Sequence, residues 1–300
     1  MLLAHLSDAH IGPLPAPRLR ELLGKRVTGW VNWRRGRRLA HDMDALAAVC
    51  ADIDAHAPDH VAFTGDVVNI GLPAEFPAAR AFLERLGPPE RVSFTPGNHD
   101  VYVRSSLRPL FDSLAPWMTG DDGVAPAPGR GFPYVRRRSA VALVGLCSGA
   151  PTMPFLASGR LGRAQIAATR RLLAQLREEG LTRVIMIHHP PHPGGARPGR
   201  GLTDAAAFAR MIAGVGAELV LHGHNHVASL ARLPGPDGPV PVLGAPSASA
   251  RPGSGGPRAG YHLIRIAPAG GGRPRITVET RGFGPQDEGV TTLARLTPAE

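Results

Sequence analysis

The sequence predicts an α/β fold in which strands end in polar loops. Short apolar runs of strand length, such as Leu2 to Leu6 and Val61 to Phe63, are followed by segments in which apolar residues recur at helical spacing. Several of these runs end directly in loops that contain Asp, His and Asn. Because loops at the carboxyl ends of strands gather in open α/β sheets, a site is expected there. The 300 residues, 43% of them hydrophobic, suffice for one large core, and we expect a single domain over residues 1–300.

In the amino-terminal half, three strands alternate with two helices. The first strand ends in polar residues and then in a proline-rich stretch, whereas the helices are recognised by their apolar spacing and by the proline or glycine that stops them. In chain order we expect a strand at 2–6, a helix carrying Met43, Leu46, Cys50 and Ile53 that stops before Pro58, a strand at 61–63, a helix carrying Phe76, Leu83 and Leu86 that ends at Gly87, and a strand at 92–95.

The rest of the chain changes character. Residues 116–137 carry Gly, Pro and Asp clusters next to an Arg136-Arg137-Arg138 run, which indicates a surface connection. A strand at 140–146, a helix at about 163–179 capped by Gly180, and strands at 184–187 and 219–221 follow. Four further short strands are expected between Gly/Pro turns, at 228–233, 240–243, 261–266 and 276–280. We interpret this last group as a second sheet that completes a sandwich.

The charge and the cysteines limit the class of protein. There are 34 Lys+Arg residues against 24 Asp+Glu, a net charge of +10 and a pI near 11.1, which favours anionic partners unless a coding bias toward Arg is the cause. Cys50 and Cys147 lie in apolar runs and are expected to be buried free thiols. The amino terminus is too short a run for a secretion signal, and no stretch of about 18 apolar residues occurs. We therefore expect a cytoplasmic protein, with peripheral attachment to the inner membrane as a second option.

The strand-end loops collect residues that bind metals. Carboxylate, imidazole and amide groups together suit Mn, Fe, Zn or Co better than an all-oxygen Ca or Mg site. Seven protein ligands are too many for one such ion and fit two ions that share a carboxylate. The loops contain eight such residues, of which all but His99 are counted as ligands: Asp8 and His10, Asp66, Asn98 and His99, His188, and His224 and His226.

In this order the loops resemble the calcineurin-like metallophosphoesterase family, whose pattern is D-x-H, G-D-x-x-D/N, G-N-H-D/E, H and G-H-x-H. The matching residues are Asp8-Ala9-His10, Gly65-Asp66-Val67-Val68-Asn69, Gly97-Asn98-His99-Asp100, His188-His189 and Gly223-His224-Asn225-His226. The resemblance covers roughly residues 1–230. It implies a four-layer α/β/β/α sandwich of two mixed sheets flanked by helices.

The resemblance also assigns ligands position by position. It implies that Asp66 bridges two divalent ions. The first ion would be held by Asp8, His10, Asp66 and His226, and the second by Asp66, Asn98, His188 and His224. His188 is preferred to His189 because it comes first after its strand. Asn69 stands where many members carry aspartate, a variant that resembles the cyclic-nucleotide and glycerophosphodiester branch.

This constellation indicates hydrolysis of a phosphodiester. Two metals about 3.5 to 4 Å apart can bind the ester, lower the pKa of a shared water and stabilise the attacking and leaving oxygens of an in-line displacement. His99 is expected to contact the charge that develops on the phosphoryl oxygens or to protonate the leaving alkoxide. Asp100, the second residue expected in catalysis, would orient His99.

A basic segment precedes the first helix. Residues 13–40 form an insertion in which Trp30 and Trp33 lie among Arg and Lys side chains. Three interpretations stay open: a cap that packs inward, a segment that lies on an anionic membrane, and a nucleic-acid contact. If residues 16–39 are helical, one face carries the apolar residues Leu19, Leu22, Leu23, Val27, Trp30 and Val31.

Several functions compete on these observations. The leading hypothesis is a phosphodiesterase acting on a small-molecule phosphate ester. The insertion resembles segments of bacterial family members that act as UDP-2,3-diacylglucosamine pyrophosphatases. A nuclease would suit the charge but lacks regular aromatic spacing for base stacking, and a non-catalytic binding module is disfavoured because every ligand position is occupied. The glycine-rich segment 194–201 carries Arg197 and Arg200, which could reach a substrate phosphate or lie in a surface loop.

Overall fold

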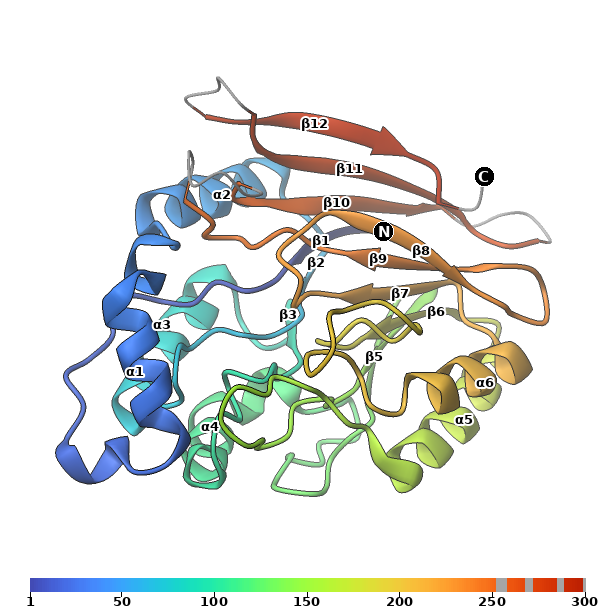
Figure 1. Cartoon of the computed structure of the whole chain (residues 1–300). Coiled ribbons are helices and arrows are strands. Elements are labelled where there is room, and N and C mark those ends of the chain that lie inside the picture. Colours follow the sequence, from blue (N-terminus) through green and yellow to red (C-terminus); the bar gives the residue numbers. More distant parts are fainter. Residues whose placement is uncertain (252–257, 268–271, 285–288, 299–300) are drawn as a thin grey trace.

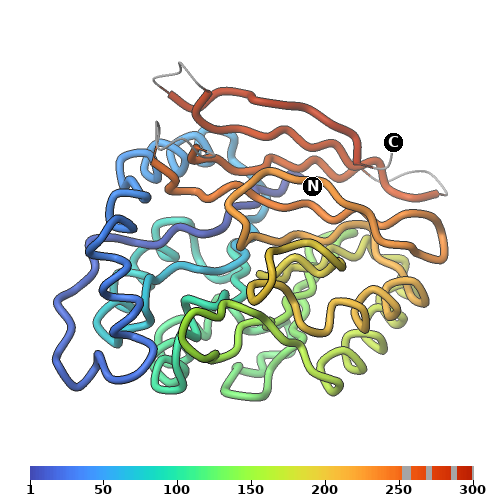
Figure 2. The backbone as a smooth tube through the Cα atoms, in the orientation of Figure 1, coloured from blue at the N-terminus to red at the C-terminus, as the bar shows by residue number. Residues whose placement is uncertain are grey.

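The computed structural model describes residues 1–251, 258–267, 272–284 and 289–298. Within these residues the chain forms two six-stranded sheets, in the orders β12-β11-β10-β1-β2-β3 and β4-β5-β6-β7-β9-β8. Figure 1 shows the sheets stacked with helices outside them, and Figure 2 shows the same path as a tube. Both sheets mix parallel and antiparallel pairs.

The first sheet contains the strands that lead into the polar loops of the amino-terminal half. Its parallel part is β1 (Leu2–Leu6), β2 (His60–Phe63) and β3 (Val92–Phe94). Its antiparallel part is β10 (Gly260–Ala267), β11 (Arg275–Phe283) and β12 (Val290–Leu296). Because β1, β2 and β3 are parallel, the loops that follow them open at the same edge of the sheet.

The second sheet is parallel in its centre and antiparallel at its edges. Strands β5 (Val141–Gly145), β6 (Thr182–Met186), β7 (Leu219–His222) and β9 (Val240–Gly244) run parallel. Strands β4 (Tyr134–Arg138) and β8 (Ser229–Leu233) pair antiparallel at its two edges. The loops after β6 and β7 carry the remaining candidate ligands.

Three apolar clusters hold the layers together. Along β5, Val141 and Leu143 face the first sheet, whereas Ala142 and Val144 face the outer helices, as the period of two in a strand requires. The helices α2 (Met43–His56), α3 (Phe76–Leu86) and α4 (Leu107–Leu114) cover the first sheet, and α5 (Gly162–Glu178) and α6 (Ala205–Val215) cover the second. The predicted four-layer α/β/β/α sandwich is confirmed.

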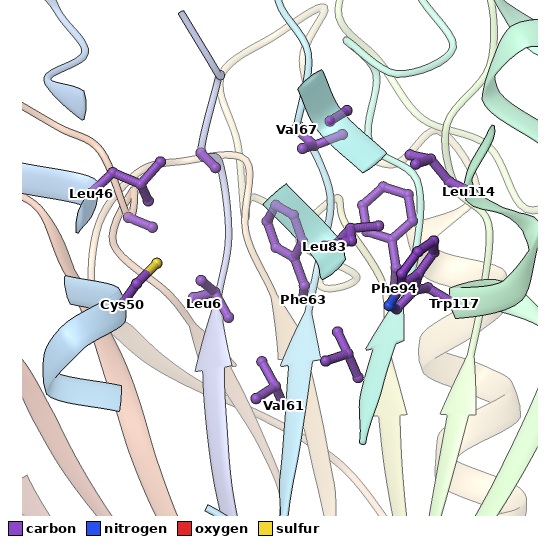
Figure 3. Close-up of a cluster of buried hydrophobic side chains, with 14 of the residues drawn as sticks. Leu6, Leu46, Cys50, Val61, Phe63, Val67, Leu83, Phe94, Leu114 and Trp117 are labelled. Carbon is purple, nitrogen blue, oxygen red and sulfur yellow. The ribbon is translucent and has the colours of Figure 1, made fainter. Parts of the chain in front are cut away.

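The core under the first sheet lies directly behind the polar loops. Figure 3 shows Leu6 on β1, Phe63 on β2 and Phe94 on β3 side by side, with Leu83 of α3 beside the two rings. The Phe63 and Phe94 ring centroids are 5.3 Å apart. These strand ends are fully buried, so the loops that follow them start from fixed positions.

The basic insertion is not one continuous helix. Residues 19–22 and 37–39 form 3₁₀ turns on either side of α1 (Lys25–Arg35), and Gly24 separates the first turn from α1 with a φ of +74°. Leu19 and Leu23 are 88% and 77% exposed and do not continue the apolar face of α1. Residues 16–39 therefore do not form the single helix on which one continuous apolar face would depend.

The inward face of α1 packs on the protein. Trp30 and Trp33 contact a small apolar cluster formed by Leu14, Ile70, Leu72 and Tyr102. The buried Arg26 guanidinium donates to the carbonyl oxygen of Ile70 at 3.2 Å and to Ser106 Oγ at 3.0 Å. These contacts attach α1 to the loop that follows β2.

Three other expectations need correction. Residues 116–137 are not only a surface connection, because Trp117 and Met118 are buried and Tyr134 begins strand β4. The short carboxyl-terminal strands do not form a sheet of their own: β8 and β9 join the second sheet, and β10 and β11 join the first. The elements α4, α6 and β12 were not anticipated. Among the described residues, no helix combines the length and apolar character needed to span a bilayer.

Candidate metal centre

The seven predicted ligands come together at the carboxyl ends of five strands. The loops after β1, β2 and β3 face the loops after β6 and β7, and hydrogen bonds join them: His224 N donates to Asp8 Oδ2 at 2.9 Å, and Gly223 N donates to the His188 carbonyl oxygen at 3.0 Å. The residues that meet there are Asp8, His10, Asp66, Asn98, His188, His224 and His226.

Five of these seven residues adopt a left-handed backbone conformation although none is glycine. Their φ angles are 56° at Asp8, 41° at His10, 57° at Asp66, 70° at His224 and 58° at His226. This conformation is unfavourable for residues with a Cβ atom and clusters at functional sites. It turns each side chain out of the strand direction and toward the shared centre.

One group of ligands surrounds Asp8. Its Oδ1 lies 3.2 Å from His226 Nε2 and 3.9 Å from His10 Nε2. His10 Nδ1 donates to the Val68 carbonyl oxygen at 3.1 Å, which fixes the tautomer and directs the unprotonated Nε2 toward the centre, where Arg37 Nη2 lies 3.1 Å from it. Asp8, His10 and His226 therefore present one oxygen and two nitrogens to a common point, all within 4.8 Å of one another.

The second group surrounds His188. Its Nδ1 donates to the Thr64 carbonyl oxygen at 2.7 Å, so Nε2 faces the centre. His224 Nδ1 lies 3.3 Å from His188 Nε2 and 2.9 Å from Asn98 Oδ1. His188, His224 and Asn98 thus form a second candidate ligand group.

Asp66 lies between the two groups. Its Oδ2 is 3.2 Å from His188 Nε2 on one side and 4.0 Å from His10 Nε2 on the other. Its Oδ1 accepts a hydrogen bond from the His99 backbone N–H at 2.7 Å. The geometry fits the shared carboxylate that the sequence predicts.

The protonation states suit a cation site. Burial opposes ionisation of Asp8, but the neighbouring His226 imidazole lowers the pKa of Asp8 to about 2. Burial lowers the pKa of His224 to about 3 and that of His10 well below its usual value. Burial also opposes the charged form of His188, but the Asp66 carboxylate raises the pKa of His188 to about 9, so this imidazole must lose a proton to bind a cation. Neutral imidazoles and ionised carboxylates are the forms that bind metals.

The hydrogen bonding and the chemical type of the candidate ligands are those expected at a cation site. Asp8 Oδ1 is buried and accepts no well-aligned hydrogen bond from the described residues, although His226 Nε2 lies 3.2 Å away; such an oxygen is costly unless a cation compensates it. The nearby histidine nitrogens and carboxylate oxygens are the ligands that borderline divalent ions prefer. The residues present therefore fit a metal centre.

The neighbouring His189 is not available in this arrangement. Its Nδ1 lies 2.8 Å from Ser148 Oγ and its Nε2 lies 3.1 Å from the Ala157 carbonyl oxygen. Both ring nitrogens are thus occupied, whereas His188 Nε2 is directed at Asp66. This difference supports the choice of His188.

Asp100 has a different task from the one expected. Its two oxygens accept hydrogen bonds from the backbone N–H groups of Gly97 (2.7 Å), Asp66 (2.8 Å), Val67 (2.9 Å) and Val68 (3.2 Å). The prediction that Asp100 orients the His99 imidazole is therefore wrong. Asp100 instead ties the loop after β3 to the loop after β2.

The loop after β3 can approach Asp66 because residue 97 is glycine. A Cβ atom at Gly97 would lie 2.7 Å from the Asp66 backbone nitrogen and 2.8 Å from Asp66 Cγ, which are clashes. The peptide of Gly97 thus lies against the Asp66 carboxylate. This contact positions the Asp66 side chain, and the hydrogen bond from the Asp66 backbone N–H to Asp100 fixes the Asp66 backbone.

His99 is oriented by Asn69 and Arg37. Its Nδ1 donates to the Asn69 carbonyl oxygen, and its Nε2 accepts from Arg37 Nη1 at 2.9 Å. Because a guanidinium only donates, this imidazole is neutral. Burial and the Arg37 charge lower the pKa of His99 to about 3. In this arrangement neither ring nitrogen has an N–H left for a substrate oxygen or a leaving group, so the contact of His99 with the site runs through Arg37.

Arg37 is a site residue that sequence reasoning did not single out. It belongs to the 3₁₀ turn after α1, yet its Nη2 lies 3.1 Å from His10 Nε2. Nothing in its spacing distinguishes it from the other arginines of the insertion. Only the folded position of the turn brings it to the centre.

Comparisons with known proteins agree with this geometry. A family model described as calcineurin-like phosphoesterase matches residues 1–228. The chain belongs to the calcineurin-like phosphoesterase family. A curated relative of this phosphoesterase is a cAMP/cGMP dual specificity phosphodiesterase of Mycobacterium tuberculosis, 27% identical over 184 residues. That match covers 59% of this chain and 52% of the relative, so it spans about half of the relative's length.

Solved structures resemble the fold of the phosphoesterase. A dimetal phosphatase from Danio rerio has a TM-score of 0.58 at 14% identity and covers 98% of both chains. A purple acid phosphatase from yellow lupin has a TM-score of 0.52 at 11% identity, over 97% of this chain and 53% of that one. At such identities the likeness establishes the fold alone. Family membership supports a hydrolase that acts on phosphate esters.

Proposed function

We propose that this phosphoesterase hydrolyses a phosphodiester with the help of two divalent metal ions. The observation that carries the proposal is the position of Asp66 Oδ2, which lies 3.2 Å from His188 Nε2 and 4.0 Å from His10 Nε2. A carboxylate oxygen between two groups of ligands suits a pair of ions better than a single one. The unpartnered Asp8 Oδ1 supports the same reading.

Asp66 would be common to both ions. The imidazole and carboxylate donors suit Mn, Fe, Zn or Co. Such ions supply charge that polarises the phosphoryl group and acidity that activates water near neutral pH. The proposed ligands are Asp8, His10, Asp66 and His226 for the first ion, and Asp66, Asn98, His188 and His224 for the second.

The chain's own groups would bind and orient the ester. Arg37 can donate two parallel hydrogen bonds to phosphoryl oxygens, a geometry that its planar guanidinium favours. His99 stacks on Tyr102, with ring centroids 5.5 Å apart, and this contact limits its rotation. We assign Arg37 to the charge that develops on the phosphoryl oxygens, and His99, whose Nε2 accepts from Arg37 Nη1, to the orientation of that guanidinium.

A diester is preferred to a monoester for two reasons. The curated relative is a phosphodiesterase by its name. In addition, residue 69 is Asn, the variant that resembles the cyclic-nucleotide and glycerophosphodiester branch of the family, and its Nδ2 donates to the Ile11 carbonyl oxygen at 2.8 Å. Cyclic nucleotides and glycerophosphodiesters are the substrates that we propose first.

A substrate panel tests the proposal. The Mn-loaded protein would be assayed with bis-p-nitrophenyl phosphate, cyclic AMP, a glycerophosphodiester, UDP-2,3-diacylglucosamine and p-nitrophenyl phosphate as the monoester. We expect hydrolysis of at least one diester, faster than that of the monoester. A protein that cleaves only the monoester, or only the pyrophosphate of the UDP lipid, would contradict the diester proposal.

Variants separate the metal centre from the substrate contacts. Asp66→Asn should lower the metal content and abolish hydrolysis, whereas His99→Ala should keep the metal and lower kcat by about 10²-fold or more. Asp112→Asn is the matched control, because that carboxylate is exposed and pairs only with Arg108. Unchanged hydrolysis in both Asp66→Asn and His99→Ala would refute the mechanism.

A further inference from the structure

A pocket of about 690 Å³ opens beside the candidate metal centre. Asn98, His99 and Tyr102 lie on the side of the centre, and α1 with Leu156 and Arg200 forms the opposite walls. The pocket is therefore continuous with the place where an ester phosphate would bind. Most of its wall comes from the basic insertion.

The walls of the pocket are joined by hydrogen bonds. Lys25 Nζ, on the first turn of α1, donates to the Leu156 carbonyl oxygen at 2.9 Å and to Thr152 Oγ1 at 2.5 Å. The Ala157 backbone N–H donates to the Gly199 carbonyl oxygen at 2.9 Å. The insertion, the loop at 152–157 and the loop at 199–201 thus form one connected wall.

Four cations line this pocket and none has a carboxylate partner. Lys25, Arg35, Arg37 and Arg200 make no ion pair with any described residue, and the described lining contains no Asp or Glu. Arg200 is close enough to Arg37 to lower its pKa, after the larger effect of burial. The four cations gather in one pocket whose described lining carries no negative side chain to offset them.

Lys25 is the most unusual of the four. It is the single lysine of the chain and is only 8% exposed. Burial lowers the pKa of Lys25 to about 8. A buried ammonium without a carboxylate is unfavourable for folding, which points to a ligand-binding role.

An ester phosphate alone does not account for these cations. Two divalent ions with the carboxylates of Asp8 and Asp66 leave two positive charges at the centre, and a phosphodiester already offsets one of them. Lys25, Arg35 and Arg200 add three more on the far wall of the same pocket. We propose that this pocket binds a second anionic group of the substrate, a phosphate or carboxylate on the organic group that the ester phosphate carries.

The spacing limits how far apart the two anionic groups lie. Lys25 Nζ is 4.5 Å from the Tyr102 ring centroid, and that centroid is 5.5 Å from the His99 ring. The distance from Lys25 Nζ to the His99 ring centroid therefore cannot exceed the sum of these two distances. An anionic group bound at Lys25 thus lies close to the ester phosphate. The side chains of Val27, Phe155 and Leu156 provide an apolar rim for the organic group. This inference rests on the proposed phosphodiesterase function.

A pair of chromogenic probes tests the inference. Thymidine 5′-(p-nitrophenyl phosphate) and its 3′-phosphorylated form present the same diester and leaving group and differ only in the second phosphate. With the Mn-loaded protein we expect kcat/KM to be about tenfold higher or more for the 3′-phosphorylated probe, the effect of one charge-assisted contact. Equal values for the two probes would overturn the inference and leave the diesterase function intact.

Variants test whether the preference for the 3′-phosphorylated probe arises in this pocket. The double variant Lys25→Met, Arg200→Gln should reduce the ratio between the two probes to near one. Arg20→Gln is the matched control, since Arg20 belongs to the same insertion but is exposed and does not line the pocket. A ratio that survives the double variant, or that is lost equally in Arg20→Gln, contradicts the assignment to this pocket.

Equilibrium binding provides a readout that does not depend on turnover. Calorimetry with the full chain freed of metal would compare thymidine 3′,5′-bisphosphate with thymidine 5′-phosphate. The inference requires about tenfold tighter binding of the bisphosphate, lost in the double variant. If neither chromogenic probe nor any diester of the substrate panel is hydrolysed, the diesterase proposal fails, and this comparison still decides whether the pocket binds a second anion.

Discussion

The Arg37 guanidinium donates a hydrogen bond to Nε2 of His99 across 2.9 Å. These residues are 62 positions apart, and the contact joins the basic insertion to the loop after β3. It keeps the imidazole neutral and fixes the guanidinium on one side of the candidate metal centre. Under the proposed function, His99 therefore orients Arg37 toward the phosphate.

Arg37→Met should lower kcat for bis-p-nitrophenyl phosphate by about 10² to 10³-fold with little change in metal content, because it removes a preorganised donor to the phosphoryl oxygens. Arg37→Lys should restore only part of the rate, since an ammonium cannot form two parallel hydrogen bonds. Steady-state kinetics and metal analysis measure both effects. Arg38→Met, at the exposed neighbouring position, serves as control, and a full rate in Arg37→Met would remove Arg37 from the mechanism.

Gly97→Ala should disrupt the metal centre while the fold persists. The added Cβ would lie 2.8 Å from Asp66 Cγ, so the carboxylate must move. We expect metal content and activity to fall at least tenfold, with an unchanged circular dichroism spectrum. Gly214→Ala in α6 is the control, because a Cβ there meets open space and should add up to about 1 kcal/mol of stability. Normal metal content in Gly97→Ala would contradict this prediction, because it would mean that the loop after β3 can move away from Asp66.

Lys25 should titrate near pH 8 rather than near its usual value of 10.5. Between these two pH values the unfolded chain binds the extra proton, so stability should rise with pH across this interval. Below pH 8 both states are protonated and this pH dependence disappears. In protein labelled with ¹⁵N-lysine, Nζ gives one resonance, because the chain has one lysine. A midpoint near 10.5 would contradict the burial argument.

Arg136→Leu should destabilise the fold by at least about 3 kcal/mol. The guanidinium is buried and donates to the carbonyl oxygens of Thr119 (2.9 Å), Pro116 (2.7 Å) and Val92 (2.5 Å), which would lose their partner. Arg137→Leu, next in sequence, removes only an exposed pair with Glu179 and should cost about 1 kcal/mol or less. Urea unfolding compares the two variants, and equal losses would refute the distinction.

Much of the fold could be predicted from local patterns. The strand at 2–6 and the helix from Met43 were identified because their apolar spacing is regular and their ends carry proline or polar residues. The run Arg136-Arg137-Arg138 was misread, because a charged run normally marks a surface. Here alternate residues of β4 face opposite sides, and carbonyl oxygens satisfy the buried Arg136.

The candidate ligands could be predicted, but their supports could not. Asp66 and His188 stand in short motifs at strand ends, and parallel strands bring such ends together. The roles of Asp100 and Arg37 depend on which backbone groups and rings lie opposite them after folding. No spacing in the sequence encodes those contacts, since 62 residues separate Arg37 from His99.

The left-handed backbone at Asp8, His10, Asp66, His224 and His226 has a consequence for evolution. Each such residue is less stable there than glycine by about 1 kcal/mol or more, so together they cost an amount comparable to the whole stability of many domains. Substitution by glycine at these positions would relieve the backbone strain but remove the candidate metal ligands. Only continued selection for the reaction keeps them, so a lineage that no longer needs the substrate should lose these residues first.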